Sequence, residues 1–372
     1  MKVLYIGHYR EGTGWANAAI DYILSMHKAG IDVVCRPVKL NNNNPEIPKE
    51  IEELEKKSLK GCNICIQHVL PHMLDYNGNF EKNIAIYATE TSHFQKTTWA
   101  EKINTMDEAW VINQEMVHSS TLSGVTIPIK VVPHACDMSK YERSYPSLGL
   151  PTKETFTFYT VGEAIRRKNL VALLKAFHIE FSPEEPVSLV IKTNKSGMSP
   201  DECQKHVSEM CNQVKLNLKL HSNVDEYKSE ILITERLSEQ EMCSLHQECD
   251  CFVMPSYGEA WSIPAFDAMA FGKTPICSNV GGMADYIGDS GILVDGRWEP
   301  VFGMTDTFSD LCTGYENWFS VCVLELRQKM RSVYESRESQ EYKQMRHSGF
   351  DRAEQFSHES VGQMIKDLLN AS

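Results

Sequence analysis

Two carboxylates near the middle of the second half of the chain have the types and spacing to bind a polar ligand. Glu259 lies in an expected loop, and Asp267 follows after seven intervening residues, about one turn into an expected helix. Both side chains could face one pocket as hydrogen-bond acceptors for hydroxyl groups. Pro264 stands in the first turn of this helix, where a missing N–H costs nothing, and Gly272 ends it.

Two consecutive strand–loop–helix units position these residues. The apolar runs Cys251–Met254 and Thr274–Ser278 are the expected strands, and Gly281-Gly282 follows the second run. Each unit would present backbone N–H groups and the positive end of a helix dipole, which suits a phosphate or diphosphate. An anion site beside two hydroxyl acceptors is what a nucleotide-sugar needs.

A second loop carries a basic run. Thr157–Val161 is an expected strand, and the loop after it contains Arg166, Arg167 and Lys168 in succession. Three cations at the end of a strand indicate an anion site, and a solvated basic run is the alternative interpretation.

The two segments Glu259–Pro264 and Asp267–Pro275 resemble the donor-site signature of retaining glycosyltransferases of family 4, which have the GT-B fold. The family signature is a glutamate, seven residues and a second glutamate, whereas this chain has Asp267 in the second place. The family usually has Gly-Phe-Gly where this chain has Ala260-Trp261-Ser262.

The basic loop resembles the family segment that reads Gly-Arg, a few residues, Lys-Gly. Lys168 matches the family lysine, which neutralises the donor diphosphate, and Glu163 stands at the position of the family arginine. Arg166 or Arg167 is expected to compensate, and the spacing leaves open which one.

The resemblance implies roles for individual residues. Lys168 and an arginine would bind the diphosphate together with the amides near Trp261–Ile263, Glu259 would bind sugar hydroxyls, and Asp267 would bind the ribose hydroxyls. The expected catalytic residues are Glu259, Lys168 and Glu90. The expected donor-binding residues are Gly14, Arg166, Arg167, Lys168, Glu259, Trp261, Ser262, Ile263 and Asp267. No metal and no cofactor are expected, because Lys, Arg and helix ends carry the neutralisation.

Two of these residues lie in the first half of the chain. Gly12 and Gly14 follow the strand Lys2–Gly7, where they could approach a diphosphate or form a plain tight turn. Glu90 follows the strand Asn83–Ala88, at the place where many family members have a histidine near the reacting sugar. A helix-capping cluster ahead of a helix over Phe94–Ile103 is the alternative for Glu90.

The order of elements and the resemblance predict an α/β protein of GT-B fold, with two Rossmann-like doubly wound domains facing each other across a cleft. Residues 1–150 would form the acceptor-side domain and residues 151–356 the donor domain, with a C-terminal helix at 357–372 crossing back onto the first. Within the donor domain, Trp298–Gly314 is expected to be a loop and Trp318–Tyr334 a helix.

Composition narrows the class of protein. The chain has 372 residues, 50 acidic and 37 basic, and a net charge of −13, which argues against a nucleic-acid partner. No secretory signal is expected, because an expected strand follows Met1 directly. No apolar run reaches the ~20 residues of a transmembrane helix. The 12 cysteines are therefore read as reduced thiols in a cytoplasmic protein. Peripheral contact with a membrane is left open.

The expected function is transfer of a sugar, with retained anomeric configuration, from a nucleoside diphosphate sugar to an acceptor hydroxyl in glycan or glycoconjugate synthesis. The enzyme would be hexosyltransferase-like and metal-independent, with a saccharide, lipid-linked or protein-linked acceptor. The alternatives are a nucleotide-sugar epimerase of the same fold and a non-catalytic relative that binds a sugar nucleotide or a glycan.

Overall fold

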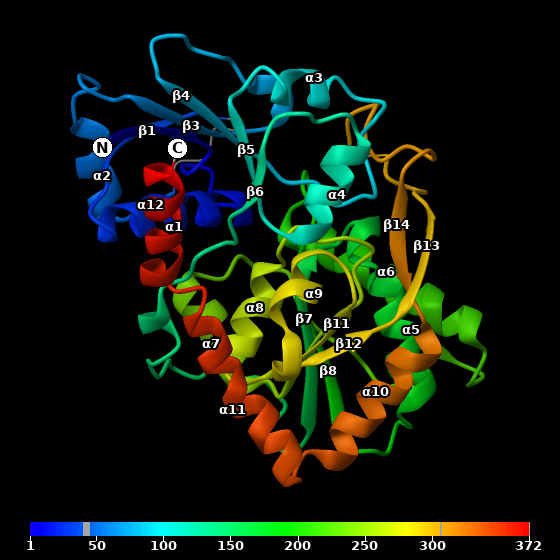
Figure 1. The fold of residues 1–372 in the computed structure, drawn as a ribbon. Coiled ribbons are helices and arrows are strands. Elements are labelled where there is room, and N and C mark those ends of the chain that lie inside the picture. Colours follow the sequence, from blue (N-terminus) through cyan, green and yellow to red (C-terminus); the bar gives the residue numbers. More distant parts are fainter. Residues whose placement is uncertain (40–44, 306, 372) are drawn as a thin grey trace. The chain divides into compact units, whose positions relative to one another are not determined.

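The computed structural model describes residues 1–39, 45–305 and 307–371. These residues form two compact units (Figure 1). Unit 1 comprises Met1–Met138, Thr307–Glu316 and Ala353–Ser372, and unit 2 comprises Ser139–Asp306 and Asn317–Arg352. Among the described residues, no helix is both long and apolar enough to cross a membrane.

Unit 1 is built on a six-stranded parallel sheet with the order β2-β1-β3-β4-β5-β6. Its strands are β1 Lys2–Gly7, β2 Asp32–Pro37, β3 Ile64–His68, β4 Lys82–Ile86, β5 Glu108–Val111 and β6 Ile129–Val131. Its helices are α1 Gly14–Lys28, α2 Lys49–Lys56, α3 Trp99–Ile103, α4 Gln114–Leu122 and α12 His358–Asn370. Every residue of β3 is buried, as expected for a strand that is covered on both faces.

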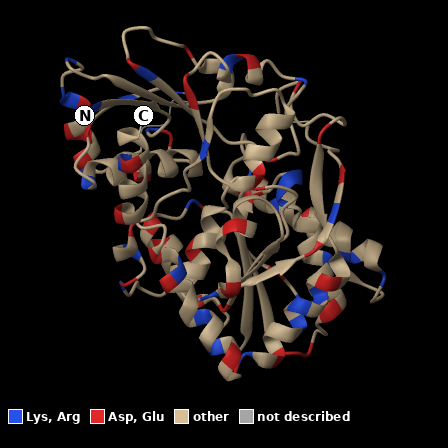
Figure 2. Ribbon diagram, in the orientation of Figure 1, with Lys and Arg blue, Asp and Glu red and all other residues tan. Residues whose placement is uncertain are grey.

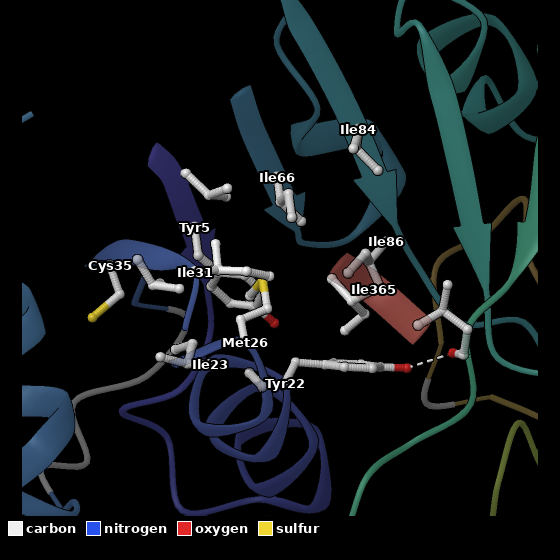
Figure 3. Close-up of a cluster of buried hydrophobic side chains, with 14 of the residues drawn as sticks. Tyr5, Tyr22, Ile23, Met26, Ile31, Cys35, Ile66, Ile84, Ile86 and Ile365 are labelled. Atoms are coloured by element: carbon white, nitrogen blue, oxygen red, sulfur yellow. Dashed lines mark hydrogen bonds between the residues drawn. The ribbon is translucent and has the colours of Figure 1, made fainter. Parts of the chain in front are cut away.

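The core of unit 1 lies between its sheet and the helices α1 and α12. Figure 3 shows Tyr22, Ile23 and Met26 of α1 beside strand residues of the sheet, together with Ile365 of α12. The C-terminal helix α12 approaches α1 so closely that a Cβ on Gly362 would lie 2.3 Å from the carbonyl oxygen of Ser25. A glycine is therefore required at this crossing.

Unit 2 repeats the architecture with a parallel sheet of order β12-β11-β10-β7-β8-β9. Its strands are β7 Phe156–Glu163, β8 Val187–Asn194, β9 Ile231–Ile233, β10 Cys251–Met254, β11 Thr274–Ser278 and β12 Ile292–Val294. Its helices are α5 Leu170–Glu180, α6 Pro200–Leu218, α7 Glu239–Glu248, α8 Ile263–Ala270, α9 Gly281–Tyr286, α10 Val323–Ser336 and α11 Gln340–Glu354, the last up to Arg352. Acidic and basic residues are interspersed along these helices (Figure 2).

A hairpin corrects two expectations from the sequence. The strands β13 (Gly296–Pro300) and β14 (Asn317–Val321) pair antiparallel, so Trp298 lies in a strand rather than a loop, and the helix α10 begins only at Val323. The reason is tertiary: Trp318 and Phe319 are buried by strand pairing and ring packing, and only the residues after them have a helical stripe.

The helix expected over Phe94–Ile103 is also shorter than predicted. Only Trp99–Ile103 forms α3, because the Phe94 amide donates to Ser123 Oγ and the Thr97 hydroxyl donates to the Phe94 carbonyl oxygen. These side-chain bonds hold the preceding residues in a turn.

Two buried histidines in unit 1 make its stability depend on pH. Burial lowers the pKa of His134 to about 3, and burial also lowers the pKa of His68 well below its usual 6.5. Both are therefore neutral in the folded protein at pH 7. In the unfolded chain they take up protons as the pH falls through 6.5, so stability must decrease from there down to about pH 3.

We expect each buried histidine to lower the free energy of unfolding by about 1 kcal/mol between pH 7 and pH 5.5, where carboxylates do not yet titrate. Urea denaturation across this range measures the effect. The variant His134→Gln should show a shallower slope, whereas a change of the exposed His27 to Gln should not. Equal slopes in all three proteins would contradict the assignment.

Candidate functional site

A cluster of three charged side chains, of which Glu259 is buried and Lys168 and Arg167 are partly buried, lies where two loops of unit 2 meet. Lys168 Nζ donates to Glu259 Oε1 at 2.6 Å, and the Arg167 guanidinium lies 3.1 Å from the same oxygen. Lys168 and Arg167 follow β7, and Glu259 follows β10, the strand next to β7. In a parallel sheet the carboxyl ends of neighbouring strands share one edge, where ligands of α/β proteins bind.

Backbone contacts fix the two loops to each other. The Tyr257 amide donates to the Arg167 carbonyl oxygen at 2.8 Å, and the Arg167 guanidinium donates to the Gly258 carbonyl oxygen at 2.7 Å. A recess beside Lys168 is lined by residues of both strand ends, among them Gly162, Thr193 and Pro255. The sequence-predicted residues Lys168, Arg167 and Glu259 are thus brought together.

The electrostatics of the cluster keep Glu259 ionised. Its side chain is 5 % exposed, and burial alone would raise its pKa. The charges of Lys168 and Arg167, with the hydrogen bond from Lys168, outweigh burial and lower the pKa of Glu259 to about 2. Glu259 is therefore a carboxylate at neutral pH and accepts hydrogen bonds without donating any.

The basic run is shaped by one residue in the left-handed region. Arg166–Lys168 forms a short 3₁₀ turn that ends at Asn169, which has φ 52° and precedes α5. The resembling family has glycine after its lysine, and asparagine is among the few other residues that tolerate this conformation.

The start of α8 has the same feature. Ser262 has φ 68° and ψ 73°, and the carbonyl oxygen of Ser262 accepts the amides of Ala265 and Phe266. The resembling family usually has glycine at the Ser262 position. The Ser262 hydroxyl is buried and has no hydrogen-bond partner among the described residues. Trp261 packs its ring against Phe266 and Tyr286, so its side chain belongs to the interior of unit 2.

The Gly281-Gly282 turn packs closely against the loop that carries Glu259. A Cβ on Gly281 would lie 1.9 Å from the Glu259 carbonyl oxygen, and one on Gly282 would lie 2.5 Å from that of Ala260. The Gly282 amide donates to the Glu259 carbonyl oxygen at 3.2 Å. The Gly282 amide therefore already has a protein acceptor, and anion binding by this second strand–loop–helix unit stays a prediction.

Asp267 is not part of the charge cluster. It lies on α8, where the Tyr141 hydroxyl donates to Oδ1 at 2.7 Å and Lys140 Nζ lies 2.9 Å from the same atom. Its role toward a ribose stays a prediction. Glu163, at the position of the family arginine, accepts the Ser196 amide at 2.9 Å and so fixes the loop after β8.

The two arginines have different surroundings. Arg167 joins Glu259, whereas the exposed Arg166 places its guanidinium 5.6 Å from the ring centre of Tyr257. Tyr257 in turn stacks on Trp318 of β14. The sequence reasoning missed Tyr257 and Trp318; the only signal was an aromatic residue two positions before Glu259.

Gly14 and Glu90 lie in unit 1. Gly14 is the first residue of α1, which Thr13 caps by accepting the Ala16 amide. Glu90 is half-buried in the segment after β4. Their roles toward a donor or an acceptor stay predictions.

The strained backbone at Ser262 gives a stability prediction. We expect Ser262→Gly to raise the free energy of unfolding by up to about 1 kcal/mol, because glycine removes the steric cost of a positive φ. Part of this gain is lost, because glycine also raises the conformational entropy of the unfolded chain. Ser262→Ala is the matched control, since it removes the buried hydroxyl but keeps Cβ. Thermal or urea unfolding in which Ala stabilises as much as Gly would contradict a backbone origin.

Part of the chain is similar in sequence to known glycosyltransferases. Residues 142–300 match the family described as Glycosyl transferases group 1. The D-inositol 3-phosphate glycosyltransferase of Corynebacterium jeikeium is 24% identical over 220 residues, 54% of this chain and 49% of that protein. The protein of the same name from Corynebacterium urealyticum is 26% identical over 181 residues, 45% of this chain and 40% of that protein. The chain therefore matches about half or less of the length of these relatives.

Solved structures resemble the whole chain. A sucrose-phosphate synthase from Thermosynechococcus elongatus aligns with a TM-score of 0.68 and 15% identity, covering 100% of both chains. Anabaena Alr3699/HepE in complex with UDP-glucose aligns with a TM-score of 0.67 and 13% identity, again over 100% of both. These likenesses establish the fold. The chain therefore has the GT-B fold and is similar to glycosyltransferases, and its residues 142–300 match the family described as Glycosyl transferases group 1.

Proposed function

We propose that this protein is a retaining glycosyltransferase that moves a sugar from a nucleoside diphosphate sugar to an acceptor hydroxyl. The observation that carries the proposal is the charge cluster of Lys168, Arg167 and Glu259 at the strand-end edge of the group 1 domain. A solved neighbour, Alr3699/HepE, is described in complex with UDP and with UDP-glucose, which supports a nucleotide-sugar donor.

The charge of the cluster suits a diphosphate. Lys168, Arg167 and the exposed Arg166 carry three positive charges, and Glu259 carries one negative charge, so the four side chains sum to about +2. The diphosphate of a nucleotide-sugar carries about two negative charges near neutral pH. Fixed cations therefore stabilise the leaving group as its negative charge grows.

In the reaction, the bond between the anomeric carbon and the diphosphate oxygen breaks, and the diphosphate keeps the electron pair. The acceptor oxygen forms the new bond to the anomeric carbon, and its proton passes to the departing diphosphate oxygen. Lys168 and the arginines stabilise the departing diphosphate, and the protein holds the sugar in place for the attack.

Glu259 fits an orienting role better than an acid role. With a pKa of about 2 it has no proton to give at neutral pH, whereas its carboxylate can accept hydrogen bonds from sugar hydroxyls. Its ion pair with Lys168 restricts both side chains. Asp267 is assigned to the ribose and Glu90 of unit 1 to the reacting sugar on the resemblance, and Gly14 of unit 1 is assigned to the donor on its place in the glycine-containing loop after β1.

The acceptor belongs to the same proposal. It is a saccharide or a lipid-linked or protein-linked hydroxyl in glycan or glycoconjugate synthesis. The resemblance to family 4 supports both this role and retention of the anomeric configuration. A cytoplasmic location stays a prediction from the sequence.

Substitution of Lys168 tests the donor site. We expect Lys168→Ala to weaken binding of the matching nucleoside diphosphate about tenfold to a hundredfold, because a charge-assisted hydrogen bond contributes about 1.5–3 kcal/mol. Calorimetric titration with UDP, GDP, ADP and dTDP first identifies the base that the wild-type protein binds. The exposed Lys175→Ala on α5 is the control and should bind as the wild type does.

The outcomes separate the functional classes. Lys168→Ala should also reduce turnover with the matching sugar donor, and proton NMR of the product should show a retained anomeric configuration. Release of an isomerised sugar nucleotide without an acceptor would indicate an epimerase instead. Binding without turnover or slow donor hydrolysis would indicate a non-catalytic relative, and unchanged binding by Lys168→Ala would overturn the assignment of this loop.

Metal independence is a second part of the proposal. Lys168, Arg167 and Arg166 already supply the positive charge that a divalent ion would bring to the diphosphate. We therefore expect the transfer rate to stay within about twofold after treatment with EDTA and gel filtration. A rate that is lost with EDTA and restored by Mn²⁺ or Mg²⁺ would contradict this part alone.

A further inference from the structure

An aromatic stack joins the hairpin to the loop that carries Glu259. The rings of Tyr257 and Trp318 lie with centroids 4.1 Å apart and planes inclined by 12°. Both side chains are buried, with 6% and 2% of their surface exposed. The Phe319 amide of β14 donates to the Tyr257 carbonyl oxygen at 2.8 Å, so a backbone bond accompanies the stack.

Arg166 lies beside the ring of Tyr257 in this stack. Its guanidinium carbon lies 5.6 Å from the centre of the Tyr257 ring, within the range of a cation–π interaction. The backbone of Gly303, beyond β13, lies along the aliphatic part of the Arg166 side chain. Among the described residues, no carboxylate forms an ion pair with Arg166.

This environment leaves the hydrogen-bonding edge of Arg166 available. A cation–π contact with an aromatic ring neutralises no charge and places no carboxylate acceptor on the guanidinium, so its N–H groups can bind phosphate oxygens. A carboxylate partner would instead occupy those donors, as Glu259 does for Arg167. The stack therefore orients the cation without neutralising it.

We propose that Tyr257 and Trp318 are positioning residues that hold Arg166 at the donor diphosphate. Arg166 then supplies the positive charge that is missing at Glu163. The inference rests on the proposed function and adds to it a role for β14, which lies outside the residues 142–300 that match the family. It also gives the hairpin a part in donor affinity.

A double-mutant cycle tests the inference with the nucleoside diphosphate that the wild-type protein binds. Arg166→Ala is expected to weaken binding about tenfold. Tyr257→Leu, which removes the ring beneath the guanidinium, is expected to weaken it about threefold to tenfold. The double variant should bind no more weakly than Arg166→Ala, because the ring acts only through the arginine.

Two further variants separate positioning from general stability. Tyr257→Phe keeps the ring and should restore most of the affinity. Tyr334→Leu removes a ring from beneath a different arginine, Arg331, in the same unit, and should leave binding unchanged. Thermal unfolding of every variant confirms that it is folded before titration, and Trp318→Leu is added if it folds.

Each result decides one question. If the wild-type protein binds none of the four nucleoside diphosphates, the proposed function fails. If it binds one and Arg166→Ala binds equally well, the inference about Arg166 is overturned while the function stands. If the losses from Arg166→Ala and Tyr257→Leu multiply in the double variant, Tyr257 does not act through Arg166 and its positioning role is wrong.

Discussion

The ion pair between Lys168 and Glu259 is the contact on which the organisation of unit 2 at its strand-end edge depends. It joins the loop after β7 to the loop after β10 across neighbouring strands, and Arg167 reinforces it from the same side. Burial of a carboxylate is unfavourable by itself, and two cations at hydrogen-bonding distance offset that cost. Because the two cations and the one carboxylate together carry a net charge of about +1, the cluster is held together and also suits an anion, as the proposed function requires.

Backbone geometry makes this ion pair possible. Asn169 and Ser262 adopt positive φ values so that each loop can turn sharply into the following helix. Gly281 and Gly282 then admit the Glu259 loop at distances that no side chain would allow. The close packing of these turns fixes the position of the Glu259 carboxylate.

The positions of Lys168 and Glu259 at strand ends could be predicted from the sequence, because strand ends and turn residues are local signals. The apolar runs before Lys168 and Glu259 placed both residues after strands of a parallel sheet, and such strand ends meet at one edge. The spacing could not show which arginine pairs with Glu259, since three consecutive residues of a tight turn point in different directions. The helical interpretation of residues 318–322 was wrong because strand pairing with β13 and the stack on Tyr257 are contacts between distant segments.

The two arginines have different partners, which suggests that they have different roles in the proposed anion site. Arg167 and Lys168 share a carboxylate, so their charges are fixed in position and partly neutralised before any ligand arrives. Arg166 has an aromatic partner, which holds its direction but leaves its charge unopposed. In the proposed donor site, a diphosphate would therefore meet one cation without a carboxylate partner and two cations that share Glu259. As negative charge accumulates on the leaving group in the proposed reaction, each of the three cations would interact with it more favourably, which is the condition for accelerating bond cleavage rather than merely binding the donor.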